Sequence, residues 1–310
     1  VRDKDITDTI FEMPELIEVR LQDARNVFKN NTFYVVQSYG IPLRRLTDED
    51  FSIAQNSSVF VGHAFQYSRF YKNYTDTKAQ SGDYYEHWYI SPTATYDSIF
   101  ESLLSNRVFI QLQPWDRNGP VGVINAGLGN DHHHYYQFRL DDYYRSGNKG
   151  TNRNGTYVYG SVEGKFRRYF DWNAHIRYHL FGYRSQDLYL GGSLTFNVFV
   201  RGRPMTLKGS FMHESRTPGY WTETYFSNHF AWNNSFSKET ETRISAAFSV
   251  PFWGLELGAR QSLLTDKVYY GPDALPVQRD GAVTVSGLYL KKDFRLGGFH
   301  LNHRVLYQYS

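Results

Sequence analysis

The sequence has no cysteine, no long apolar run and no block of charge of one sign. Without cysteine the chain has neither a disulfide scaffold nor a thiol nucleophile. No stretch approaches the ~18 consecutive apolar residues of a transmembrane helix. The formal net charge is only +3 and the basic residues are spread along the chain, so no nucleic-acid partner is expected.

Catalytic and cofactor motifs are missing as well. The sequence has no Gly-x-Ser-x-Gly, no phosphate-binding loop and no paired-carboxylate motif, and Glu239-Thr240-Glu241 lacks the partner that a general acid/base site would show. We therefore expect no enzyme activity and no cofactor.

The ends of the sequence carry no obvious boundary signals. Val1 to Asp8 is charged from its start, unlike a secretory leader. The last residues, up to Ser310, stop inside a strand pattern. The sequence is therefore expected to be a fragment at both ends.

Aromatic residues are abundant, with 26 Tyr, 23 Phe and 6 Trp. Tyrosine and tryptophan form the interfacial girdles of membrane barrels, although they also suit carbohydrate-binding surfaces. The mean hydropathy of −0.56 fits a barrel with a polar interior.

The most informative pattern is a strict alternation of apolar and polar residues between Asp171 and Val200, broken only at Tyr183 to Asp187. Alternation places one set of side chains on each face of a strand. Each face continues for about a dozen residues, whereas ordinary strands have ~5–6 and a tilted membrane strand needs ~9–11. These strands have membrane length.

The alternation recurs along the chain and predicts an all-β fold, an antiparallel transmembrane β-barrel of the outer-membrane type with about 14 or more strands. Residues 1–30 are expected to be a polar non-barrel or loop segment, and residues 31–310 a barrel that is incomplete at both ends. The expected strands are 32–42, 58–72, 107–113, 120–129, 132–140, 155–167, 171–183, 188–201, 205–214, 221–233, 239–252, 255–270, 282–292 and 296–309.

The expected strand order contains an inconsistency. It places the long loops at 141–155 and 271–281 on opposite sides of the membrane, so at least one hairpin is wrongly assigned. The expected source of the error is the corner Val250 to Gly254, which contains Pro251. Asp293-Phe294 and Arg168 to Phe170 are expected to be tight turns.

His132, His133 and His134 form a conspicuous cluster. Consecutive strand residues point to opposite faces, so the three rings do not converge on one ion unless they lie in a loop. A polar turn entering a strand is the preferred interpretation, and no metal site is predicted.

Charged residues on the polar positions of the strands are the candidate lumen-facing groups. Such residues either set the selectivity of a pore or pair with one another and fill a closed interior. The candidates are Lys165, Arg167, His175, Arg177, His179, Arg243, Arg260 and Arg304.

Several segments resemble one family. They are Phe28 to Gly40, Thr95 to Ser98, Leu112 to Trp115, Val250 to Leu255 and His300 to Ser310. They are similar to the central part of the large outer-membrane porins of Bacteroidetes-type Gram-negative bacteria. The resemblance runs along most of the chain and implies an outer-membrane β-barrel with a transport role, longer than this chain. It carries no defined substrate and no catalytic residue.

Three functions remain open at this point. The first is a porin of the cell outer membrane, in contact with membrane lipid, that gives small solutes passive passage. The second is a non-conducting barrel that acts with other outer-membrane proteins as a structural component of an assembly. The third is a soluble β-rich carbohydrate-binding module.

Overall fold

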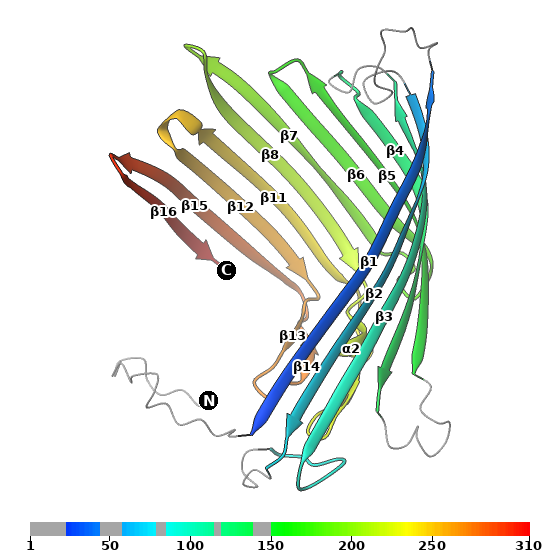
Figure 1. The fold of residues 1–310 in the computed structure, drawn as a ribbon. Helices are drawn as coiled ribbons and strands as arrows, with labels where there is room; N and C mark the ends of the chain where they lie inside the picture. The colour runs from blue at the N-terminus through cyan, green and yellow to red at the C-terminus, as the bar shows by residue number, and fades with distance from the viewer. Residues whose placement is uncertain (1–22, 44–57, 79–84, 115–118, 139–149) are drawn as a thin grey trace.

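The described chain is almost entirely antiparallel β-structure. The computed structural model describes residues 23–43, 58–78, 85–114, 119–138 and 150–310. One sheet of 12 strands runs in chain order from β1 to β16 (Figure 1). Its strands are β1 Ala24–Pro42, β2 Ser58–Asp76, β3 Thr95–Gln113, β4 Val123–Gln137, β5 Thr151–Phe166, β6 Phe170–Gly182, β7 Leu188–Val200, β8 Arg203–Arg216, β11 Glu239–Val250, β12 Leu255–Thr265, β15 Ala282–Leu296 and β16 Phe299–Tyr309.

Smaller elements occupy the connections. They are the short helix α2 (Tyr220–Glu223), the 3-10 turn η3 (Pro251–Trp253) and two small hairpins, β9 (Thr224–Phe226) with β10 (Ala231–Asn233) and β13 (Val268–Tyr270) with β14 (Pro276–Gln278). No helix among the described residues is long and apolar enough to cross a bilayer.

The sheet has two different faces, which we call the outer face and the inner face. The outer face carries Leu194 and its register partner Gly209, and the inner face carries Thr195 and its partner Lys208. On β6, β7, β11 and β12 the outer-face positions hold no Asp, Glu, Lys or Arg. The outer face is therefore the apolar one.

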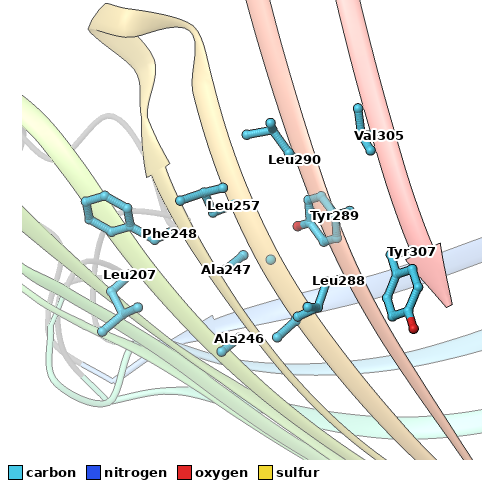
Figure 2. A pocket seen from close by; sticks show the side chains of 12 residues that line it. Leu207, Ala246, Ala247, Phe248, Leu257, Leu288, Tyr289, Leu290, Val305 and Tyr307 are labelled. Carbon is cyan, nitrogen blue, oxygen red and sulfur yellow. The ribbon is translucent and has the colours of Figure 1, made fainter. Parts of the chain in front are cut away.

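A row of apolar side chains crosses the outer face from β8 to β16. Its members are consecutive register partners: Leu207, Phe248, Leu257, Leu290 and Val305. Figure 2 shows these side chains along the same part of the sheet. Each is between 38% and 61% exposed. Since a continuous apolar surface is unfavourable in water, this face is suited to lipid.

The height of the apolar face matches a bilayer. On β7 the apolar outer-face side chains run from Leu188 to Val198. At ~3.4 Å per residue this is about 34 Å of strand, and a tilt of ~45° reduces it to about 25 Å, the height of the apolar band of outer-membrane barrels. β1, β2 and β3 have 19 residues each, more than a bilayer crossing needs, so they extend beyond this band.

The alternation predicted for β6 and β7 is present, with one exception. Ile176, Leu194 and Phe196 are 47–48% exposed on the outer face. The exception is Leu180, which has no register partner on β5 because the register between β5 and β6 shifts at Thr156/Tyr157.

Several predicted boundaries are wrong. Residues 95–106, which lie outside the expected strands, begin β3, and the expected break between 129 and 132 lies inside one continuous strand, β4. The expected turn at Asp293-Phe294 lies inside β15, because the chain reverses at Gly297-Gly298 instead. The tight turn at Arg168 to Phe170 is confirmed.

The inconsistency in sidedness has one cause. The segment 221–233 is not a long strand but contains part of α2 and the hairpin of β9 and β10. The suspected corner is a tight turn, since η3 is followed by Gly254 in the left-handed conformation with φ 58°. With six long strands between them (β5, β6, β7, β8, β11 and β12), the start of β5 and the end of β12 lie at the same end of the sheet.

The two ends of the sheet therefore differ. At one end, which we call the short-turn end, four connections are short, 167–169, 201–202, 251–254 and 297–298, and two are longer, 43–57 and 114–122. At the other end, which we call the loop-rich end, four connections are long, 77–94, 138–150, 217–238 and 266–281, and one is short, 183–187. Among the described residues β1 pairs only with β2 and β16 only with β15, so the sheet is open between these edges. β1 begins at Ala24, and residues 1–22 of the predicted non-barrel segment lie outside the described residues.

Candidate functional site

The inner face carries the charged residues that the sequence singles out. All of them except Arg167 lie on strands, at positions that alternate with the apolar outer-face residues. Arg167 lies in the turn between β5 and β6 with φ 52°. The others have these register partners: Lys165 with Asp171, His175 with Gly191, Arg177 with Tyr189, His179 with Tyr157, Arg243 with Ser262, Arg260 with Gly287, and Arg304 with Lys291. They are spread along the sheet and do not form one cluster.

Some of these charges are paired. Lys165 Nζ lies 3.6 Å from Asp171 Oδ1, and Arg243 forms an ion pair with Glu241. Since these side chains are partly exposed, each pair contributes only about 0–1 kcal/mol to stability. Their main effect is that each pair carries no net charge.

Other arginines of the inner face rest on tyrosine rings. The guanidinium carbon of Arg177 lies 5.2 Å from the centre of the Tyr157 ring, and that of Arg107 lies 5.3 Å from Tyr159. Such cation–π contacts position the guanidinium without neutralising it. Neither arginine has a carboxylate partner among the described residues.

Glycines make room for the inner-face aromatic rings. A Cβ atom on Gly127 would lie 2.4 Å from the backbone oxygen of Val108 and 2.6 Å from Cε1 of Tyr159. The Tyr159 ring, against which the Arg107 guanidinium lies, can therefore occupy its position only because residue 127 has no side chain.

Gly127→Ala is expected to destabilise the folded protein by about 1–3 kcal/mol, because the new methyl group overlaps a backbone atom that cannot move independently. Urea titration of protein folded in lipid vesicles measures this effect. The matched control is Gly209→Ala, where an added Cβ meets nothing within 4 Å. Equal stability of the two variants would contradict the packing described here.

The connection between β8 and β11 folds over the inner face, and we call residues 217–238 the inward segment. Its Tyr220 ring stacks on Tyr135 of β4 with the centroids 4.0 Å apart, and Trp221 Nε1 donates to Glu101 of β3. Since β4, β5, β6 and β7 separate β3 from β8, the segment crosses the inner face at the loop-rich end. Figure 1 shows α2 within the curve of the sheet, so the inner face is the concave one.

Asn228 anchors the inward segment and is 1% exposed. Its Oδ1 accepts hydrogen bonds from the backbone N–H groups of Ile90 (2.9 Å) and Ser91 (2.8 Å). Its Nδ2 donates to the Ser91 carbonyl (2.9 Å) and to Thr95 Oγ1 (3.0 Å). Its backbone N–H donates to Asp97. Every polar atom of this side chain is therefore satisfied by the segment before β3 or by β3 itself.

Aromatic contacts add to this anchoring. The rings of His229 and Tyr85 stack with centroids 3.5 Å apart. Tyr183, in the β6–β7 turn, donates from its hydroxyl to Glu223 (2.7 Å). Burial raises the pKa of Tyr183 well above its ordinary value, and the Glu223 carboxylate adds to this effect. Tyr183 therefore stays a protonated hydrogen-bond donor at neutral pH.

The histidine cluster lies within β4 and is not a turn, contrary to the preferred interpretation. His132 and His134 are hydrogen-bonded to Asn154 and Asn152, whereas His133 lies on the inner face, 3.4 Å from Glu101. The three rings do not converge, for the geometric reason that the alternation predicts. Within the described ranges no three His, Asp or Glu side chains gather as a metal site would require.

Sequence reasoning missed the inward segment and its partners on 85–101. Two signals were available, because Pro218-Gly219 and Asn233-Asn234 are turn-forming pairs that flank the aromatic residues. The long-range partners had no local signal, since Asn228 and Ser91 are separated by 137 positions.

A wide antiparallel sheet with an apolar outer face of bilayer height, polar on its concave side, defines an outer-membrane β-barrel protein. The chain belongs to the family described as "Putative porin", whose match extends over residues 1–310. The location is therefore the cell outer membrane, which argues against the soluble carbohydrate-binding module. No curated protein sequence matches the chain.

Two solved structures support the fold. The chain is similar to a protein titled "Copper transporter OprC", with a TM-score of 0.58 and 11% identity over 93% of this chain and 47% of that one. It is also similar to the siderophore receptor PirA from Pseudomonas aeruginosa, with a TM-score of 0.50 and 9% identity over 91% of this chain and 57% of that one. The chain thus spans about half the length of these proteins. At such low identity the likeness extends to the fold alone.

Proposed function

We propose that the protein is a non-enzymatic outer-membrane channel that gives small solutes passive passage along the inner face. The observation that carries this proposal is the pairing of an apolar outer face with a polar inner face on the same strands. Bilayer lipid contacts the outer face, and water with dissolved solutes contacts the inner face. The short-turn end faces the periplasm, as in other bacterial barrels.

The fixed charges of the inner face set the preference of the channel for anions. Arg177 and Arg107 keep their full charge because tyrosine rings, not carboxylates, hold them. A fixed charge on a pore wall raises the local concentration of ions of opposite sign. Lys165 and Arg243 contribute less, since their carboxylate partners cancel them.

Neutralising Arg177 and Arg243 together, as Arg177→Gln/Arg243→Gln, is expected to shift the ion preference of the channel toward cations. Two positive charges are lost, and Glu241 is left without its partner. The reversal potential of the full-length protein in planar bilayers under a salt gradient measures the shift. The shift should shrink at high salt, because the screening length falls from ~8 Å at physiological ionic strength to ~3 Å at 1 M.

The matched control removes both members of an ion pair. Glu241→Gln/Arg243→Gln changes two side chains of the same wall without changing its net charge, so its reversal potential should equal that of the unmodified protein. If this control shifts the potential as far as Arg177→Gln/Arg243→Gln does, charge is not the determinant of selectivity.

A second function, a non-conducting barrel within an outer-membrane assembly, is favoured by the inward segment. This segment occupies the concave side at the loop-rich end and is held there by Asn228 and by stacked rings. Absence of conductance from the full-length protein, together with co-purification of other outer-membrane proteins, would favour this role over the channel.

A further inference from the structure

A cavity lies on the inner face at the loop-rich end, with a volume of about 620 Å³. It is formed by β6, the β6–β7 turn, β7, β8 and the start of the inward segment. Its charged lining consists of Arg177, Arg184, Arg216, Asp187 and Glu214. The volume falls within the ~300–1,000 Å³ range of small-molecule sites.

Part of this charge is already neutralised. Asp187 forms an ion pair with Lys238 and accepts a hydrogen bond from Thr217 Oγ1 (2.8 Å). Arg216 Nε donates to Glu239 at 3.0 Å. These side chains build the wall of the cavity and add no net charge to it.

Arg177 and Arg184 are left without a partner of opposite charge. Across the described residues neither forms an ion pair or a side-chain hydrogen bond, and Arg177 rests on the Tyr157 ring with its N–H groups unused. The remaining carboxylate, Glu214, opposes Tyr189 and Glu241 in the register. Two arginines against one carboxylate leave the cavity with an excess positive charge.

His179 forms part of the wall of the same cavity and is only 6% exposed. Its Nδ1 is enclosed on the side of Gly155 in β5, so it does not face a solute in the cavity.

We propose that this cavity binds a small solute through an oxyanion group, a phosphate or a carboxylate. The guanidinium groups of Arg177 and Arg184 offer planar pairs of donors that match two oxygens of such a group. The inference rests on the proposed function, because a dissolved solute reaches the cavity only along a water-filled inner face.

The test is calorimetric titration of the full-length protein in phospholipid-free detergent with inorganic phosphate and, in separate experiments, with succinate and with a short-chain anionic phospholipid. Arg177→Gln/Arg184→Gln is expected to weaken binding by about tenfold or more, because two charge-assisted contacts are lost. Arg177→Lys/Arg184→Lys, which keeps the charge but not the paired donors, should weaken it less. The control Arg201→Gln/Arg295→Gln removes the same charge from exposed side chains at the short-turn end and should bind as the unmodified protein does.

Three results would overturn the inference: no binding of either anion, equal binding by the cavity and control variants, or binding only of a short-chain anionic phospholipid. The far-UV circular dichroism spectrum of each variant must retain its β signal. Conductance is measured separately. If the protein conducts but its anion binding does not depend on the arginines, the anion site is refuted and the channel function stands. If binding depends on the arginines but the protein does not conduct, the channel function is refuted and the anion site stands.

Discussion

Leu194→Arg is expected to lower the free energy of unfolding in a bilayer by about 2–4 kcal/mol, the cost of an arginine at the middle of the lipid-facing surface. Leu194 lies at the centre of β7 on the outer face and is 48% exposed. Urea titration of protein folded in lipid vesicles measures the change.

The neighbouring residue provides the control. Thr195 lies on the inner face of the same strand, opposite Asp171 and Lys208, so Thr195→Arg should cost far less. Val198→Arg adds a test of depth, because Val198 is on the outer face but close to the short turn at 201–202. Near the interface the cost falls to ~0–1 kcal/mol. Equal losses at positions 194 and 195 would refute the assignment of the faces.

Asn228→Ala is expected to detach the inward segment from β3. The substitution removes four side-chain hydrogen bonds and leaves the N–H groups of Ile90 and Ser91 without an acceptor. Each buried group left unsatisfied costs about 1–3 kcal/mol. Hydrogen exchange of residues 217–238 should accelerate, and single-channel conductance should rise if the segment narrows the path.

Asn233→Ala is the matched control, because Asn233 is exposed in β10 and its side chain accepts one hydrogen bond from Thr224. Its exchange rates should stay close to those of the unmodified protein. Unchanged protection of the inward segment in Asn228→Ala would show that the stacked rings, such as Tyr220 on Tyr135, hold the segment without Asn228.

The alternation in the sequence was sufficient to predict the β-structure, the apolar outer face and the outer-membrane class. It places Ile176 and Leu194 on the apolar face and Arg177 on the polar face. The physical reason is local, because the extended backbone directs neighbouring side chains to opposite faces. The position of a residue within a single strand therefore assigns it to one face of the sheet. Where the register shifts, as at Thr156/Tyr157, parity alone does not assign a residue such as Leu180, which has no register partner on β5.

Only the tertiary structure decided which charges are paired, which aromatic segment leaves the sheet and where a cavity forms. Arg177 and Arg243 occupy equivalent polar positions in the sequence, yet one rests on Tyr157 and the other pairs with Glu241. The segment 221–233 is as aromatic as a membrane strand, but it packs on Glu101 and Tyr135, which are distant in the chain. These outcomes depend on strand register and on contacts across the concave face. The alternation of apolar and polar residues along one strand does not specify either of them.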